Sequence, residues 1–258
     1  MLDGHRTIGR VADVSRIPGP PTLTQLLPDL KTRRRSPEVM DQPGLDPAEH
    51  ARALEALRRV NLFSATVRAT WPRIRAFAND RAAPLRLLDV ACGGGDFAAR
   101  IARRARSEGV ALEVSGCDMS EFAVAHATEH ARRSGVPASF FRHDVLAQPF
   151  PEGFDVLTCS LFLHHLDEPE AVGLLRAMKA AGKLLLVDDL ERGRAGWLLA
   201  YAGIRILSRS AVAHVDGPLS VEGAFTRDEA RTLAEAAGWE RPEAVGRFPC
   251  RFLLAEGR

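Results

Sequence analysis

The stretch LLDVACGGGDF, residues 87–97, decides the fold of this chain. A run of apolar residues carries one acid, Asp89, and is followed at once by Gly93, Gly94 and Gly95. An apolar strand that leads through glycines into a helix is typical of nucleotide-binding α/β proteins, because a backbone without side chains can approach a ligand closely. The stretch therefore predicts a buried strand, a ligand-binding turn and a helix.

Strand and helix patterns alternate after this turn. Strands are expected at 85–90, 112–117, 139–143, 154–160 and 183–188, and helices at 96–106, 121–133 and 168–180. Such alternation predicts a mostly parallel sheet with helices on both faces. A further helix is expected between Thr226 as N-cap and Gly238 as stop. Two short strands, 243–247 and 250–254, are too close for a helical crossover, so they should pair antiparallel.

The chain before the sheet divides into two parts. Residues 1–45 contain RIPGPP, KTRRRSP and DQPGLDP without sustained periodicity, which predicts a mostly disordered extension. Residues 46–80 carry apolar residues at helical spacing after Asp46 and Pro47, which predicts a helical cap; Pro72 should kink or restart its second helix. Residues 81–258 form the main domain, with an apolar insertion at about 190–223.

Bulk properties exclude several classes of protein. The chain has 258 residues, which suits one sizeable domain with extensions, and its net charge of +2 is too small to indicate a nucleic-acid partner. No apolar run is long enough to span a membrane, and the start lacks the apolar core of a secretory signal. A cytoplasmic protein is the expectation.

The four cysteines form no C-x-x-C pair. Cys92, Cys117 and Cys159 fall at the ends of expected strands, so their thiols should gather there as small buried apolar groups. The sequence therefore predicts no metal.

The glycine turn alone leaves the ligand open. Gly93 to Ala98 fits G-x-G-x-x-A, a dinucleotide fingerprint, and Asp118 ends the second strand, where a ribose-binding acid belongs. A bare structural turn and an NAD(P)-dependent oxidoreductase are the alternatives. Asp89 discriminates, because a buried carboxylate disfavours a pyrophosphate and favours a cationic ligand. The sulfonium and α-ammonium groups of S-adenosylmethionine are such charges.

The stretch resembles the first motif, D/E-x-G/A-x-G-x-G, of the class I S-adenosylmethionine-dependent methyltransferases, and the later stretch FDVLTCSLFLHHLDE resembles a motif common in their ubiquinone/menaquinone type. Four residues match it position by position: Asp89, Ala91, Gly93 and Gly95. Further motifs follow in the same order, and the resemblance covers about residues 50–256. It implies a Rossmann-like sheet of seven strands, mostly parallel with an antiparallel last strand, and S-adenosylmethionine as cofactor.

The later motifs imply further contacts to that cofactor. GCDMS implies that Asp118 accepts hydrogen bonds from the ribose hydroxyls, with Met119 beside it. RHDVLAQPFP implies that Asp144 meets the adenine amino group and that Val145 offers its backbone nitrogen. FDVLTCSLFLHHLDE resembles the motif of the fourth strand and adds Ser160 to the cofactor site.

Methyl transfer needs a base only if the acceptor must lose a proton. Candidate catalytic residues are His164 and His165 after the fourth strand, and His214 in an expected loop of the insertion. For each histidine the alternative is a purely structural role, and for His164 and His165 that role is to form a turn. Asp188 is a base or, with Asp189, a cap of the following segment.

The insertion contains AGWLLAYAGIRIL, residues 195–207, a helix that is apolar nearly all round. Core packing is the first interpretation. The alternatives are a dimer contact, a membrane-surface contact, or the wall of an apolar acceptor pocket.

The sequence thus predicts a methyltransferase that acts on a small, apolar acceptor such as a phenolic, quinone-like or lipid-like molecule. O-methylation is slightly favoured over C-methylation, because histidines could take a phenolic proton. A nucleic-acid acceptor is disfavoured, since no N-P-P-[YF]-type tetrapeptide follows the fourth strand. A non-catalytic methyltransferase-like binding protein is the remaining alternative. The oligomeric state is left open.

Overall fold

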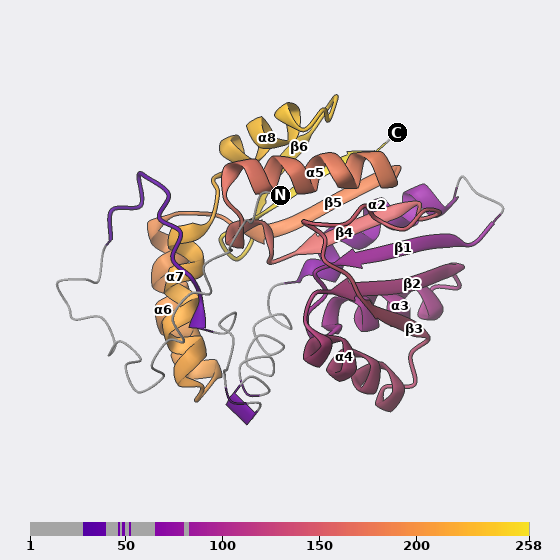
Figure 1. Ribbon diagram of the computed structural model, residues 1–258, viewed down its shortest axis with the longest axis horizontal. Coiled ribbons are helices and arrows are strands. Elements are labelled where there is room, and N and C mark those ends of the chain that lie inside the picture. Colours follow the sequence, from indigo (N-terminus) through magenta and orange to yellow (C-terminus); the bar gives the residue numbers. More distant parts are fainter. Residues whose placement is uncertain are drawn as a thin grey trace, which may run out of the picture.

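The computed structural model describes residues 28–39, 46, 48–49, 52, 65–79 and 83–257. Its centre is a seven-stranded sheet in the order β3-β2-β1-β4-β5-β7-β6 (Figure 1). The strands are β1 (Leu85–Val90), β2 (Leu112–Asp118), β3 (Ala138–Arg142), β4 (Val156–Ser160), β5 (Leu184–Leu190), β6 (Glu243–Arg247) and β7 (Arg251–Gly257). The neighbouring pairs among β1 to β5 are parallel, and β7 runs antiparallel to both β5 and β6. The predicted fold class, including the antiparallel last strand, is confirmed.

Helices cover both faces of this sheet. The helices are α2 (Thr66–Asn79), α3 (Asp96–Ser107), α4 (Glu121–Arg133), α5 (Glu168–Ala181), α6 (Arg194–Leu207), α7 (Ala211–Gly223) and α8 (Arg227–Ala236). One apolar cluster joins α5 and α8 to one face, and a second joins α2 and α3 to the other. The predicted cap Thr226 begins α8 in a reciprocal pair with Glu229.

Helix α2 continues through Pro72 and does not restart there. Its side chains Trp71 and Ile74 are buried against the sheet, and this packing holds the helix together where the proline removes one backbone hydrogen bond. The helix predicted to begin at Asp46 falls mostly outside the described residues.

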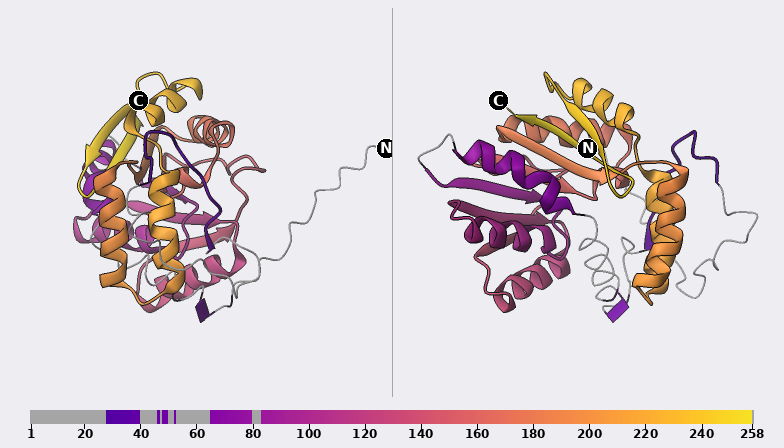
Figure 2. Two further views of the ribbon diagram at one scale, coloured as in Figure 1. Left: turned by 90° about the vertical axis from the view of Figure 1, so that its left-hand side faces the viewer. Right: turned by 180° about the vertical axis from the view of Figure 1, so that it is seen from behind.

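The insertion after β5 is a pair of helices, α6 and α7, that stand beyond the carboxyl end of β5 (Figures 1 and 2). The segment around His214 was predicted to be a loop, and this is wrong, because it belongs to α7. The side chain of Ser210 caps this helix at the backbone N–H of Ala213. Gly217, which precedes a proline inside the helix, lies against α6, where an added Cβ would be 3.5 Å from Ile204. Contact with α6 therefore stabilises a helix whose interior contains a glycine and a proline, two residues that disfavour helices.

Core packing explains only one face of α6. Trp197 and Ile204 are buried, and the indole N–H of Trp197 donates to Glu222 at 3.0 Å. Leu198, Leu199 and Ile206 are 46%, 47% and 83% exposed, so the opposite face presents apolar side chains to solvent. The sequence could not reveal this, because apolar character all round does not say which face is covered.

Residues 28–39 lie within the predicted disordered extension, yet the structure packs them beside α7 (Figure 1). The guanidinium of Arg33 donates to the carbonyl oxygens of Gly223, His164 and Leu166 at 2.6, 3.0 and 2.6 Å. It also lies 3.7 Å from the ring centroid of Phe225. We name this part of the chain the N-terminal segment. Side-chain contacts such as those of Arg33 hold the N-terminal segment in place, and the lack of apolar periodicity explains why the sequence did not predict this.

The anchoring role of Arg33 predicts a loss of stability on its removal. Arg33→Ala should lower the free energy of unfolding by about 2 kcal/mol, because charge-assisted hydrogen bonds to three carbonyls are lost. Arg34→Ala is the matched control, since Arg34 is exposed and bonds to Glu222 through its backbone N–H. Chemical denaturation of the two variants and the wild type measures the difference. Equal stabilities for the two variants would contradict the anchor.

Candidate active site

The glycine turn bends the chain sharply between β1 and α3. Ala91, Gly93 and Gly95 have φ angles of 53°, 51° and 74°, in the left-handed region that favours glycine. A Cβ at Gly95 would lie 2.8 Å from that of Ala127 and 2.9 Å from Phe140, so the approach of α4 also requires glycine there. A Cβ at Gly93 would meet nothing within 4 Å, so the turn leaves space beside this residue.

Asp89 is buried, and the hydroxyl of Thr158 donates to its carboxylate at 3.0 Å. Burial, with a smaller contribution from the negative charges of Asp118 and Asp96, raises the pKa of Asp89 to about 7, against the lowering effect of the hydrogen bond from Thr158. A carboxyl group with this raised pKa gains most from a positive charge nearby, because a cation restores its ionised form.

Asp118 joins the end of β2 to the glycine turn. Its carboxylate accepts from the backbone N–H of Gly93 and from that of Ser120, both at 2.9 Å. Each carboxylate oxygen has a further lone pair for a ligand hydroxyl. The side chain of Met119, next in the chain, is 64% exposed.

The loop after β3 extends this site. The backbone N–H of His143 donates to the carbonyl of Asp118 at 2.9 Å, which fixes the loop beside β2. Asp144 accepts from the N–H of Leu146 at 3.0 Å, and Val145 is buried.

Parallel pairing brings these predicted cofactor residues to one edge of the sheet. Val90 is level with Cys117 in β2 and with Cys159 in β4, and Asp118 with Arg142 in β3. Ser160 ends β4 at the same edge, level with Asp188. The individual contacts of these residues with a cofactor stay predictions.

The cysteines at this edge are free thiols. Burial raises the pKa of Cys117 to about 12 and raises those of Cys92 and Cys159 well above the usual value. Protonated, buried thiols suit apolar packing and are poor metal ligands.

His164 lies in a single 3₁₀ turn, Leu163–His165, that follows β4. It is buried, its Nδ1 lies 2.6 Å from Asp189 Oδ1, and its Nε2 lies 3.6 Å from Glu38 Oε1. Burial alone would lower the pKa of His164, but the two carboxylates outweigh it and raise it to about 10. In this state the imidazole is a cation between two anions and not a general base.

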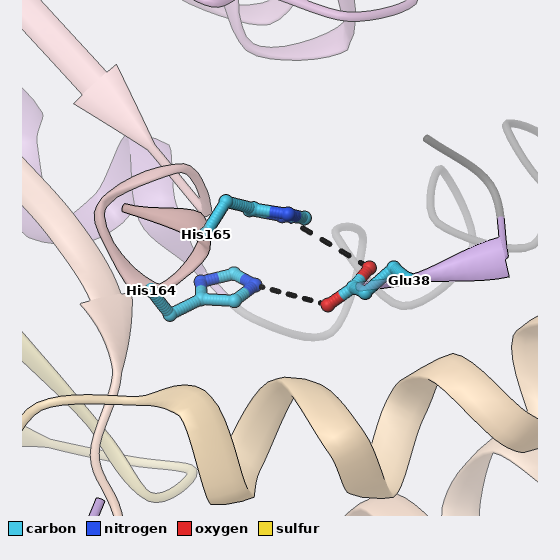
Figure 3. A group of neighbouring side chains, drawn as sticks. All are labelled: Glu38, His164 and His165. Carbon is cyan, nitrogen blue, oxygen red and sulfur yellow. Dashed lines mark ion pairs between the residues drawn. The ribbon is translucent and has the colours of Figure 1, made fainter. Parts of the chain in front are cut away.

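Glu38 comes from the N-terminal segment and completes this group (Figure 3). It is buried, its Oε2 lies 4.0 Å from His165 Nε2, and the hydroxyl of Ser220 donates to Oε1. Burial would raise the pKa of Glu38, but His164, His165 and Ser220 lower it overall. The two imidazole rings lie 4.2 Å apart between centroids. We name Glu38, His164 and His165 the Glu-His-His cluster.

A cavity of about 160 Å³ borders the Glu-His-His cluster. Its wall is made by residues 35–38 of the N-terminal segment, by the two histidines and by Leu219, Ser220 and Gly223 of α7. The sequence analysis missed Glu38, because it lies in a Pro- and Arg-rich stretch without periodicity and far from the histidines in the chain.

Two other candidates lie elsewhere. The Nε2 of His214 is bonded to the carbonyl of Ser208 at 2.8 Å, and His214 is not among the residues that line the cavity. Asp188 is buried and pairs with Arg247 and Arg251 at 2.7 and 2.9 Å, so it anchors the terminal hairpin and serves neither as the expected base nor as a cap. Asp189, its neighbour, orients His164 instead.

Within the described part of the chain, we find no helix with the length and apolar character to cross a membrane.

The chain is similar to known methyltransferases. Residues 87–183 match the family model of a methyltransferase domain. The ubiquinone biosynthesis O-methyltransferase of Pseudomonas entomophila is 34% identical over 122 residues, 46% of this chain and 50% of that protein. That of Photorhabdus laumondii is 30% identical over 122 residues, 46% of this chain and 48% of that protein. The chain therefore spans about half the length of these curated relatives.

The solved structure of an S-adenosylmethionine-dependent methyltransferase from Aquifex aeolicus has the same fold. It matches with a TM-score of 0.55 at 18% identity, over 82% of this chain and 97% of that one. The sheet order, the acid-glycine turn and the family match agree with the resemblance found in the sequence. Residues 87–183 therefore carry a methyltransferase domain, and the sheet around it has the fold of the S-adenosylmethionine-dependent methyltransferases.

Proposed function

We propose that this protein transfers a methyl group from S-adenosylmethionine to an oxygen of a small, apolar acceptor, phenolic or quinone-like in character. One observation carries the proposal: the acid-glycine turn after β1 and the Glu-His-His cluster after β4 lie at the same edge of the sheet, on neighbouring strands. The proposed donor site and the cavity with polar groups thus follow two neighbouring strands. The names of the relatives, O-methyltransferases of ubiquinone biosynthesis, agree with an oxygen acceptor.

The residues around the turn fit S-adenosylmethionine. Asp89 supplies a buried carboxylate for the cationic methionine end, and the space beside Gly93 admits that end close to the backbone. The start of α3 has no side-chain cap, so its N–H groups can meet the methionine carboxylate. When bound, the cofactor supplies a methyl group already activated on sulfur.

The cavity fits an acceptor with one polar end. Pro37 and Leu219 contribute apolar wall, and the Glu-His-His cluster contributes hydrogen-bonding groups. In the proposed reaction, the acceptor hydroxyl would give its proton to His165 of this cluster, and the acceptor oxygen would take the methyl group. The bound cofactor would supply that methyl group and leave as a neutral thioether. Positioning supplies most of the acceleration, since the donor is already activated.

Turnover tests the reaction itself. The full chain, incubated with S-adenosylmethionine and a panel of phenols, catechols and hydroquinones, should yield a product heavier by one methylene, detected by mass spectrometry. His165→Asn should lower kcat by about 100-fold or more while the cofactor Kd stays unchanged, because proton removal contributes on that scale. Cofactor binding without transfer to any acceptor would instead favour a non-catalytic binding protein.

The raised pKa of Asp89 predicts a pH dependence of cofactor binding. The cofactor is a cation, so it binds the ionised carboxylate, and its affinity should rise as pH increases through about 7. One pH unit below that pKa, affinity should fall about tenfold. Isothermal titration between about pH 5.5 and 7.5 measures this slope, below the range where the cofactor's own ammonium loses its proton. Asp89→Asn should bind weakly and without the slope; an unchanged slope would refute the role.

Asp118 gives a second prediction for the cofactor. Asp118→Ala should weaken binding of S-adenosylmethionine by about 1 to 3 kcal/mol through the lost hydrogen bonds to the ribose. Glu113→Ala, on the same strand but exposed and away from the edge, is the control. Affinity that stays equal in the two variants would remove the ribose assignment.

A further inference from the structure

The Glu-His-His cluster brings together two imidazole nitrogens and a carboxylate oxygen. In the described part of the chain, these three ligand atoms all lie within 4.8 Å of one another. Figure 3 shows Glu38 entering from the N-terminal segment and facing both histidines of the turn after β4. This donor set, mixed nitrogen and oxygen, is one that divalent transition metals and zinc accept in proteins.

The spacing of the donors is close to that of a metal site. His164 Nε2 lies 3.6 Å and His165 Nε2 lies 4.0 Å from the nearest Glu38 oxygen. In tetrahedral coordination with bonds of about 2.0–2.1 Å, donor atoms lie about 3.3 Å apart. Shortening each of these two His–Glu distances by less than about 1 Å would bring it to that value.

Asp189 orients the first imidazole as a metal ligand would require. Its carboxylate holds Nδ1 of His164 at 2.6 Å, which leaves Nε2 turned toward Glu38. Asp189 is itself buried and also accepts from the backbone N–H groups of His164 and Leu190. A carboxylate behind a histidine is the usual support of a zinc-binding imidazole, because it fixes the tautomer and the ring orientation.

The Glu-His-His cluster is buried on most sides and borders the cavity on one side. Glu38 and His164 are more than nine-tenths buried, whereas the cavity borders all three residues on one side. Three protein ligands and one position open to a cavity are the pattern of a catalytic zinc site, where the fourth ligand is water or substrate.

We propose that Glu38, His164 and His165 bind a divalent cation of the Zn²⁺ class, and that the acceptor hydroxyl is its fourth ligand. This rests on the proposed methyl transfer. Bound to the cation, the hydroxyl releases its proton to solvent water, and the resulting oxygen anion attacks the methyl carbon of the cofactor. The carbon–sulfur bond breaks with its electron pair on sulfur, so neither oxidation nor a further reactant is needed.

The proposal differs from the expectation of no metal, which rested on the cysteines. The competing arrangement is a plain ion-pair group, with a proton on Nε2 of His164 between Asp189 and Glu38. A metal ion would take the position of that proton, so one protein molecule cannot have both arrangements at once. A measurement of metal binding therefore distinguishes them.

The test is a titration of the full chain, freed of metal by a chelator, with Zn²⁺ in a calorimeter. The wild type should bind one equivalent that Glu38→Gln and His165→Asn weaken by at least about tenfold, as expected for a lost ligand. His214→Asn is the matched control, because it removes a histidine outside the cluster, and it should bind as the wild type does. Equal affinities in all four proteins, or no binding by the wild type, would overturn the site.

Two ligand variants are used because one of them can fail to fold. Glu38 is buried, so Glu38→Gln can disturb packing, whereas His165 is partly exposed. If Glu38→Gln unfolds, His165→Asn alone decides the outcome. Circular dichroism and thermal unfolding without metal should show that His165→Asn keeps the wild-type fold.

Activity separates this proposal from the proposed function. If a chelator stops methyl transfer and Zn²⁺ restores it, the metal role is supported. If transfer is unaffected by the chelator, the metal role is overturned and the methyltransferase stands. If the chain binds no S-adenosylmethionine, the proposed function fails, while the Zn²⁺ titration still reports on the cluster.

Discussion

The structure depends on the parallel pairing of β1 with β2 on one side and with β4 on the other. Level pairing at Val90, Cys117 and Cys159 makes these three strands end together. The segments that follow these strands therefore lie at one edge of the sheet. They are the glycine turn after β1, the acid at the end of β2 and the turn after β4 that carries the histidines. From β1 the chain continues to β2 and β3 on one side of the sheet and then crosses to β4 and β5 on the other. A crevice for ligands forms at such a change of direction, here between β1 and β4.

The two carboxylates buried at the end of β5 are each matched by a basic side chain from another element. Asp188 and Asp189 are adjacent in β5, so their side chains point to opposite faces of the sheet. Asp188 accordingly meets Arg247 and Arg251 from the terminal hairpin, and Asp189 meets His164. Burying a carboxylate is costly without such partners. The same dipeptide thus fastens the hairpin on one side and orients an imidazole on the other.

The sequence was sufficient for those features that short-range patterns determine. Alternating strands and helices, the turn of three glycines and the cap at Thr226 are local signals, and the structure confirms each of them. The loop expected around His214 was wrong: this segment is helical, and α7 keeps Gly217 and Pro218 in its interior while it packs against α6. Glu38 was missed because its role depends on partners more than a hundred residues away along the chain, and no periodicity marks such a contact.

The N-terminal segment and α7 form most of the cavity wall, whereas the strand ends hold the acids around the glycine turn. Neither wall element belongs to the sheet, and the segment is joined to it by a few side-chain anchors. Under the proposed function, substitutions in the cavity wall would change the preferred acceptor and leave the sheet edge proposed for the cofactor intact.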